Sequence, residues 1–347
     1  MSTSGRGLRR CLFGVLLAVT GCNGTTSYLD ATGTAGHAEA VLGRWLTGVS
    51  VAVVVLVCIA IIAGMARRRE SSDAPARSDA LARGDAPARH EIASGLSWIY
   101  VGLGATMVVL LVTFGGTMVT LNAATHPRRT PSLTMDVTGH QWWWEVRYSQ
   151  EGNAGLGFVT ANEVHLPIGI PVRVRLHAAD VIHSFWLPQI AGKTDVIPGQ
   201  TNEMWVEARV PATTRGMCGE YCGLQHANMA LQVVAESPSA FNAWAASRRA
   251  EAAPAQGDLV AGQTIFARTC GACHAVAGTM ALGRVGPDLT HVASRPFIGA
   301  GVLENTAPNL ERWIVDAPAV KEGARMPAIA LNAAQRRSVV AYLQSLR

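Results

Sequence analysis

Two long apolar stretches without a charged side chain lie in the N-terminal part of the chain. They cover residues 45–66 and 96–121, which is 22 and 26 residues. As α-helices at about 1.5 Å per residue they would reach about 33 and 39 Å, against about 30 Å for the hydrocarbon core of a bilayer. A buried helix of a soluble protein is the alternative, but uncharged runs of this length are typical of membrane spans. The pattern predicts a transmembrane hairpin over residues 40–125.

A polar linker, residues 67–95, separates the two stretches and repeats the sequence DAPAR. This linker holds six arginines, whereas residues 23–44 hold one. Because basic residues are enriched in cytoplasmic loops, we expect the linker in the cytoplasm and both chain ends outside it. Everything after about residue 125 is then expected in an oxidising, extracytoplasmic space.

The first residues have the pattern of an export signal. Arg6, Arg9 and Arg10 precede a short apolar run that is too short to span a bilayer. The run ends in VTGC, which resembles the lipobox of bacterial lipoproteins with Cys22 as the lipid acceptor. Ordinary cleavage and an uncleaved anchor are the alternatives. We expect a signal peptide over residues 1–21 and an extracytoplasmic segment over residues 22–39.

Composition agrees with a folded, partly membrane-embedded chain. Charged residues make up 15%, against about 25% in ordinary soluble domains, and hydrophobic residues make up 49%. That apolar content can build a core, which argues against disorder over the whole chain. The net charge of +5 is too small and too dispersed to indicate a nucleic-acid partner.

Beyond the apolar stretches, the hydrophobic period changes to two. Apolar residues at 172, 174 and 176 alternate with polar residues at 173, 175 and 177, and glycine and proline divide the region into short segments. Such alternation is typical of half-buried strands. Residues 130–236 are therefore expected to form an antiparallel β-sandwich of about 100 residues.

Residues 217–229 (MCGEYCGLQHANM) gather soft metal ligands in one short loop. The thiols are Cys218 and Cys222, and they are followed by the imidazole of His226 and the thioether of Met229. This donor set favours copper, because zinc rarely takes a thioether. Two thiolates can each bridge, which suggests more than one metal ion. A Cys218–Cys222 disulfide is the alternative in an oxidising compartment.

The loop resembles the dinuclear copper centre of cytochrome c oxidase subunit II, whose pattern is Cys-x-Glu-x-Cys-x-x-x-His-x-x-Met. The resemblance implies a cupredoxin-like fold and a second histidine on an earlier strand, which DVIHS at residues 180–184 matches. It also implies that the Glu220 side chain meets a magnesium ion at the boundary with subunit I. The implied copper ligands are His183, Cys218, the carbonyl oxygen of Glu220, Cys222, His226 and Met229.

Residues 139–144 (GHQWWW) resemble the aromatic segment of the same family. There, Trp142 stands at the position that receives electrons on their way to copper. In a single strand, Trp142 and Trp144 would share one face and Trp143 would lie on the other. A role in the core and in an interfacial aromatic belt is the alternative.

One position departs from the family pattern. Subunit II often carries a carboxylate three residues before the tryptophan that begins its second membrane helix, at the mouth of a proton channel. With Trp98 as that tryptophan, the position is Gly95. Glu91 is the nearest carboxylate, so the proton-entry group is either Glu91 or absent from this chain.

Residues 270–274 (CGACH) form the attachment signature of a c-type haem. Cys270 and Cys273 would carry the two thioether bonds, and His274 would be one axial ligand. A zinc site or a redox Cys-x-x-Cys pair is the alternative. The adjacent histidine and the helical pattern around the motif favour haem.

The stretch after an alanine-rich linker, residues 237–256, resembles a class I cytochrome c. This all-α domain would cover residues 257–347. Met326, followed by a proline, is the expected sixth ligand, and a thioether there would raise the reduction potential. Residues 286–289 (GPDL) resemble the family loop in which a prolyl carbonyl oxygen accepts a hydrogen bond from the axial histidine.

A subunit II with a fused cytochrome c resembles the caa-type haem–copper oxidases of bacteria. The resemblance implies the electron-entry subunit of a proton-pumping cytochrome c oxidase. Electrons would pass from a c-type cytochrome or a cytochrome bc complex, through haem c and the dicopper centre, to the haem of subunit I, where oxygen is reduced to water. It further implies subunits I and III as partners and a multi-pass position in the bacterial inner membrane, with both metal domains on the periplasmic side.

A membrane-anchored copper and haem carrier that feeds a different terminal reductase is the alternative function. The two-helix hairpin before the copper domain favours the oxidase. Purification with or without a large haem-bearing partner would distinguish the two.

The motifs predict the cofactor content of the chain. The purified protein should contain two copper ions and one covalently bound haem per polypeptide, as measured by metal analysis, haem analysis and an optical spectrum. A single copper ion, or haem that is extracted without breaking a covalent bond, would contradict the assignment of the two motifs.

Overall fold

The computed structural model describes residues 24–71, 89–150 and 153–347 of the chain. The expected signal peptide, Cys22 and most of the arginine-rich linker lie outside these residues. The chain divides into two compact units, one of residues 40–122 and one that joins the earlier residues to residues 123–347.

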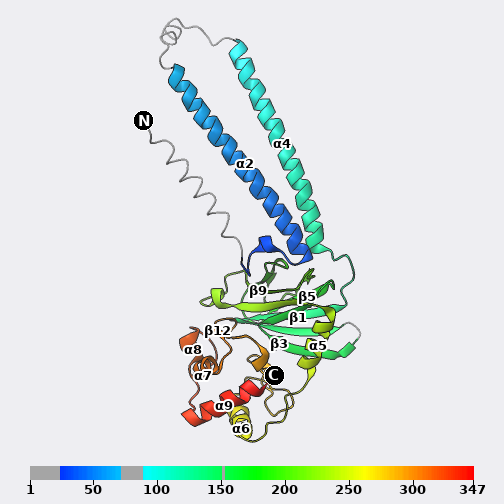
Figure 1. Cartoon of the computed structure of the whole chain (residues 1–347), viewed down its shortest axis with the longest axis vertical. Coiled ribbons are helices and arrows are strands. Elements are labelled where there is room, and N and C mark those ends of the chain that lie inside the picture. Colours follow the sequence, from blue (N-terminus) through cyan, green and yellow to red (C-terminus); the bar gives the residue numbers. More distant parts are fainter. Residues whose placement is uncertain (1–23, 72–88, 151–152) are drawn as a thin grey trace. The chain divides into compact units, whose positions relative to one another are not determined.

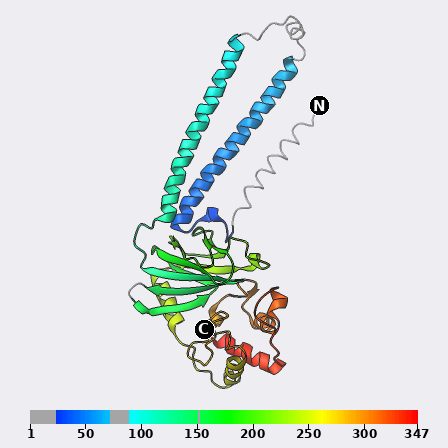
Figure 2. The same ribbon diagram turned by 180° about the vertical axis from the view of Figure 1, so that it is seen from behind.

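Two long helices, α2 (Thr34–Ser71) and α4 (Arg89–Thr125), run in opposite directions (Figures 1 and 2). Their segments Thr34–Ala66 and Leu96–Thr125 are long and apolar enough to cross a membrane. Apolar side chains such as Leu56 point outward along them, as lipid contact requires. Both helices continue beyond the uncharged runs into the polar residues that flank them. The backbone of Glu91 therefore lies in the first turns of α4.

The strands form a β-sandwich of two five-stranded sheets (Figure 1), which confirms the predicted fold class. Most neighbouring strands are antiparallel, while the pairs β1–β5 and β4–β10 are parallel. One sheet has the order β3 (Asn153–Ala161), β2 (Trp143–Gln150), β1 (Leu133–His140), β5 (Val172–Ala178) and β8 (Asn202–Val206). The other has the order β4 (Glu163–Pro167), β10 (Ala230–Glu236), β9 (Ala212–Cys218), β6 (His183–Leu187) and β7 (Ala191–Val196).

The period-two pattern of β5 directs its apolar side chains into the sandwich. Val172, Val174 and Leu176 are fully buried. The intervening Arg175 is on the outer face, where its Nε lies 2.7 Å from Asp136 Oδ1 on the neighbouring β1. The sheet is thus held by apolar burial on one face and polar pairs on the other.

The aromatic segment over residues 139–144 does not form one strand, so that expectation is wrong. β1 ends at His140, and Gln141 and Trp142 form the turn into β2. The chain reverses there because β1 and β2 pair as a hairpin, with His140 opposite Trp143. The rings of these two residues stack with their centroids 4.3 Å apart.

The residues before α2, including the short helix η1 (Tyr28–Asp30), are joined to the sandwich by backbone hydrogen bonds. The N–H groups of Thr32 and Gly33 donate to the carbonyl oxygen of Gln189, at 2.7 and 2.9 Å. A Cβ atom at Gly33 would lie 2.2 Å from the carbonyl oxygen of Ile190, so a side chain cannot be accommodated there without displacing the backbone. These contacts hold the first residues of α2 against the sandwich.

The alanine-rich connector after the sandwich is ordered, not a plain linker. It contains α5 (Pro238–Arg249), which begins where the side chain of Ser237 accepts the N–H of Ala240. Trp244 of α5 stacks on His165 with ring centroids 3.9 Å apart. The apolar face of α5 thus extends the core of the sandwich.

The C-terminal region is the predicted α-helical domain, with one short hairpin added. Phe266 of α6 and Tyr342 of α9 lie at the centre of its core. The elements are α6 (Leu259–Thr269), η3 (Val292–Ser294), β11 (Phe297–Ile298), β12 (Leu303–Glu304), α7 (Ala307–Val315), α8 (Ala317–Val320) and α9 (Ala333–Ser345).

The close approach of α6 to α9 depends on Gly262. A Cβ atom there would lie 2.1 Å from the carbonyl oxygen of Ser338 in α9. We predict that Gly262→Ala destabilises the domain by about 1–3 kcal/mol, because overpacking against a backbone outweighs the gain in helix propensity. Thermal unfolding followed by the haem absorption measures the effect. The control is Thr264→Ala on the exposed side of α6, expected within about 0.5 kcal/mol of the unmodified protein. Equal stability of both variants would refute the packing argument.

Candidate copper and haem sites

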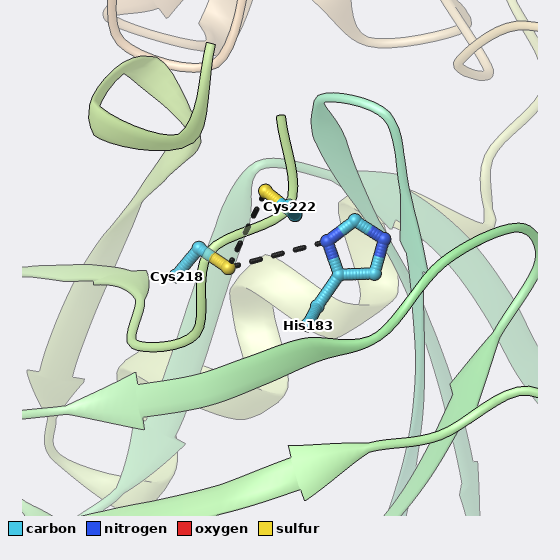
Figure 3. Close-up of side chains that lie close together, drawn as sticks. All are labelled: His183, Cys218 and Cys222. Atoms are coloured by element: carbon cyan, nitrogen blue, oxygen red, sulfur yellow. Dashed lines mark hydrogen bonds between the residues drawn. The ribbon is translucent and has the colours of Figure 1, made fainter. Parts of the chain in front are cut away.

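The pairing of β6 with β9 brings His183 beside the two thiols. Phe185 lies opposite Cys218 in this register, so the start of β6 meets the end of β9. The Nδ1 atom of His183 lies 4.0 Å from Cys218 Sγ, and Cys218 Sγ lies 3.7 Å from Cys222 Sγ (Figure 3). The sulfur–sulfur distance is far longer than the roughly 2.05 Å of a disulfide bond. Both cysteines are free, which excludes the disulfide alternative.

The remaining predicted donors gather around the same pair of sulfurs. His226 begins the short helix η2 (His226–Asn228), and its Nδ1 lies 3.7 Å from Cys222 Sγ. The thioether sulfur of Met229 lies 3.8 Å from Cys222 Sγ. The carbonyl oxygen of Glu220 lies 3.1 Å from Cys218 Sγ. The structure therefore brings together donor atoms of all six residues that the sequence singled out.

The carboxylate of Glu220 lies beside a lysine at the surface. It is half-exposed, and its Oε2 lies 3.7 Å from the Nζ of Lys193. The carbonyl and the side chain of this residue thus face different surroundings, as two separate roles would require.

The chemistry of the donor set fits copper. The hydrogen bond from the Cys222 thiol lowers the pKa of Cys218, and the same interaction raises the pKa of Cys222. The first of the two thiol protons is therefore lost readily from Cys218, which leaves one thiolate available to a cation. Thiolate, imidazole and thioether donors together select a soft metal.

Asp180 orients His183, a role that the sequence analysis did not assign. The imidazole Nε2 lies 2.9 Å from Asp180 Oδ1, which leaves Nδ1 facing the sulfurs. The backbone N–H groups of Gln141 and Val181 donate to the same carboxylate. Burial opposes the charge of Asp180, but the hydrogen bonds from His183 and the two N–H groups hold its pKa below the ordinary value. The signal in the sequence was the spacing of Asp180 and His183 by three residues.

The β1–β2 turn closes the copper loop from one side. The indole Nε1 of Trp142 and the Nε2 of Gln141 both donate to the carbonyl oxygen of Cys222, at 2.9 and 2.8 Å. Gly139 leaves room for the imidazole of His183, because a Cβ atom at this position would lie 2.8 Å from its Cδ2. The aromatic segment and the cysteine loop thus form one packed structure.

A cavity in the cytochrome domain contains all the expected haem-binding residues. Its walls include Cys270, Cys273, His274 and Met326, and its empty volume is about 1150 Å³, part of it open to solvent. The Nδ1 of His274 lies 2.8 Å from the carbonyl oxygen of Pro287, which is the hydrogen bond expected from the GPDL loop. Burial lowers the pKa of His274, so its Nε2 is available as a neutral donor. Two thiols, an imidazole and a thioether around one cavity fit a covalently bound haem.

One wall of this haem cavity comes from the copper domain. His140, Gln141, Trp142 and Trp143 line it together with the cytochrome residues. Trp142 therefore borders the haem cavity and contacts the cysteine loop at the same time. This arrangement joins segments more than 120 residues apart in the sequence, so no local pattern could have revealed it.

Fold and sites together define an electron-transfer protein, with a copper-binding cupredoxin-like sandwich joined to a c-type cytochrome domain. Residues 152–237 match the family of cytochrome C oxidase subunit II, periplasmic domain, and residues 259–347 match the cytochrome c family. Cytochrome c oxidase subunit 2 of Alkalihalophilus pseudofirmus is 36% identical over 256 residues, which cover 73% of this chain and 72% of that protein. The chain belongs to the cytochrome c oxidase subunit 2 family.

Other relatives are similar to smaller parts of the chain. Cytochrome c oxidase subunit 2 of a Bacillus species (strain PS3) is 32% identical over 229 residues, which cover 62% of this chain and 63% of that protein. Among solved structures, the periplasmic domain of subunit II of cytochrome oxidase of Bradyrhizobium japonicum covers 35% of this chain and 96% of that chain, at 31% identity and a TM-score of 0.32.

The two family matches imply that the chain binds copper and haem c. As its relatives are, this chain is a subunit of a cytochrome c oxidase, with a fused cytochrome c domain. The family and the two kinds of cofactor are those that the copper and haem motifs predicted.

The role of Asp180 is testable by copper retention. Asp180→Asn replaces one acceptor oxygen by an amide N–H that faces the N–H of Gln141 or His183. We predict a loss of about 10–100-fold in copper affinity, the usual effect of removing the partner of a ligating histidine, measured by competition with a chelator. The matched control is Asp195→Asn, an exposed aspartate on the adjacent strand β7. Equal copper retention in the two variants would show that Asp180 does not orient a ligand.

Proposed function

We propose that this chain is the electron-entry subunit of a proton-pumping cytochrome c oxidase. A c-type cytochrome or a cytochrome bc complex would supply single electrons, which pass through haem c and a dicopper centre to the haem of subunit I. Reduction of oxygen to water and the coupled pumping of protons belong to subunit I. The observation that carries this proposal is that Trp142 borders the haem cavity while its indole N–H donates to the carbonyl oxygen of Cys222.

The proposed dicopper site would be held by Cys218 and Cys222, together with His183, His226, Met229 and the carbonyl oxygen of Glu220. Bound copper supplies a centre that accepts and releases one electron. The chain's own contribution is rigidity and exclusion of water, because His183 and Met229 are fully buried and both cysteines nearly so. Ligands held by a packed core keep similar positions in both oxidation states, which lowers the reorganisation that electron transfer requires.

The proposed haem would be attached covalently through Cys270 and Cys273 and held by His274 and Met326. Bound haem supplies a second one-electron centre. Pro287 would hold the imidazole of His274 in a fixed orientation through its carbonyl oxygen. Joining this site to the copper domain through α5 and a short connector raises the effective concentration of one centre near the other.

Trp142 is proposed as the residue that links the two sites. It is nearly fully buried, its indole N–H donates to the carbonyl oxygen of Cys222, and its side chain lines the haem cavity. In this chain the electron reaching Trp142 would come from the fused cytochrome domain, and an external cytochrome would deliver its electron to that domain.

The remaining assignments follow the family resemblance. We propose that the arginine-rich linker is cytoplasmic, that both metal domains are periplasmic and that the chain assembles with subunits I and III in the bacterial inner membrane. We propose residues 1–21 as a signal peptide, with Cys22 as the lipid acceptor. The domains are proposed as residues 40–125, 130–236 and 257–347. A magnesium ion at the Glu220 carboxylate is proposed for the boundary with subunit I, and the proton-entry carboxylate is either Glu91 or absent from this chain.

A carrier that feeds a different terminal reductase remains the second candidate. Two helices of membrane-spanning length before the copper domain favour the oxidase, because a single helix would be enough to anchor a carrier. Purification of the intact membrane complex distinguishes the two, since the oxidase predicts a co-purifying subunit that carries haem and reduces oxygen.

The proposed route predicts a strict order of reduction. On rapid mixing of the complex with a reduced c-type cytochrome, haem c should be reduced first and copper second. His274→Ala should retain copper but slow its reduction by at least about tenfold, because the first electron acceptor is lost. His177→Ala, a partly exposed histidine on β5, is the control and should leave both phases unchanged. Copper reduction at the unmodified rate in His274→Ala would exclude entry through the fused cytochrome.

A further inference from the structure

Lys321 is a buried cation at the contact between the cytochrome and copper domains. It follows α8 and has a relative exposure of 4%. A lysine is rarely buried to this degree unless its ammonium group finds several acceptors. Burial lowers its pKa to about 7. A charge kept here needs compensation from the atoms around it.

Three backbone carbonyl oxygens surround the ammonium group. The Nζ atom lies 2.8 Å from the carbonyl oxygen of Trp142, 2.8 Å from that of Asn228 and 2.8 Å from that of Gly299. An ammonium group has three N–H donors, so each can be used once. Two of the acceptors belong to the copper domain and one belongs to the cytochrome domain.

The two copper-domain acceptors lie beside the metal donors. Asn228 directly precedes Met229, and Trp142 donates through its indole to the carbonyl oxygen of Cys222. On the cytochrome side, Lys321 is followed by Gly323, where a Cβ atom would lie 3.0 Å from the indole of Trp142, and then by Met326. One short segment thus connects the expected haem ligand to the copper loop.

Other contacts also join the two domains, each through fewer hydrogen bonds than the three of Lys321. Arg295 approaches Glu163 at 3.8 Å, and Arg325 approaches Asp180 at 3.8 Å with most of its side chain exposed. The N–H of Ala230 donates to the carbonyl oxygen of Ala300 at 3.1 Å. Among the described residues at this contact, Lys321 makes hydrogen bonds to both the Trp142 turn and the copper loop.

We propose that Lys321 is a positioning residue that fixes the cytochrome domain against the copper loop and so sets the rate of electron transfer from haem c to copper. Its three hydrogen bonds select one docked arrangement of the two domains. Without them, the domains stay tethered through the connector after α5, but they occupy that arrangement for a smaller part of the time. This inference rests on the proposed route from haem c to copper.

Replacement by Lys321→Met keeps the length and apolar part of the side chain and removes all three donors. In the intact complex, the expected rate of electron transfer from haem c to copper falls by at least about tenfold, because the observed rate scales with the docked fraction. The reduction potentials and optical spectra of both centres should stay as in the unmodified protein. Reduction of haem c by an external donor should also be unchanged, so haem c should be more reduced during turnover.

Two further variants complete the experiment. Arg337→Met removes an exposed cation from α9 of the same domain and should transfer electrons at the unmodified rate. Lys321→Gln keeps two N–H donors and should show an intermediate rate of electron transfer from haem c to copper. If Lys321→Met fails to bind haem or copper, the rate of Lys321→Gln tests the positioning role instead.

The outcomes separate this inference from the function on which it rests. An unmodified complex that passes no electrons from haem c to copper refutes the proposed route. An unmodified complex that does so, together with a folded Lys321 variant of equal rate, refutes the positioning role alone. Altered potentials that account for the whole change in rate would also overturn it.

Discussion

The pairing of β6 with β9 is the constraint on which the copper site depends. It brings His183 to the end of the strand that finishes at Cys218, although the two residues are 35 positions apart. The loop after β9 then returns through η2 and delivers Met229 to the same pair of sulfurs. A soft donor set can form here because the sheet holds His183 and Cys218 and the loop holds the other donors. The sandwich core keeps both elements in register.

A second constraint is the turn between β1 and β2. Its two residues, Gln141 and Trp142, donate side-chain hydrogen bonds to the cysteine loop and also line the haem cavity. A hairpin turn suits this double contact, because it projects from a rigid pair of strands and offers side chains to both the cysteine loop and the haem cavity. The cytochrome domain meets the copper domain at this turn, and Lys321 donates to the carbonyl oxygen of Trp142 at that contact.

At each site, an imidazole expected to bind metal is oriented by a hydrogen bond to a partly buried acceptor. Asp180 accepts from His183 and from two backbone N–H groups, and Pro287 accepts from His274. These acceptors determine which imidazole nitrogen is left for a metal. The protein itself thus orients these ligands. An electron-transfer centre requires this, because its ligands must keep similar positions in both oxidation states.

The sequence by itself determined the two apolar helices, the β-sandwich, the α-helical cytochrome domain and the residues that gather at each site. Hydrophobic period and motif spacing are local properties, so residues such as Cys218, Cys222 and His274 could be identified from their neighbours. The chain reversal at Trp142, the packing of α5 on the sandwich and the role of Lys321 could not be predicted in this way. Each depends on contacts between segments distant in sequence or on a choice between strand and turn. Only the packing of the whole chain decides these.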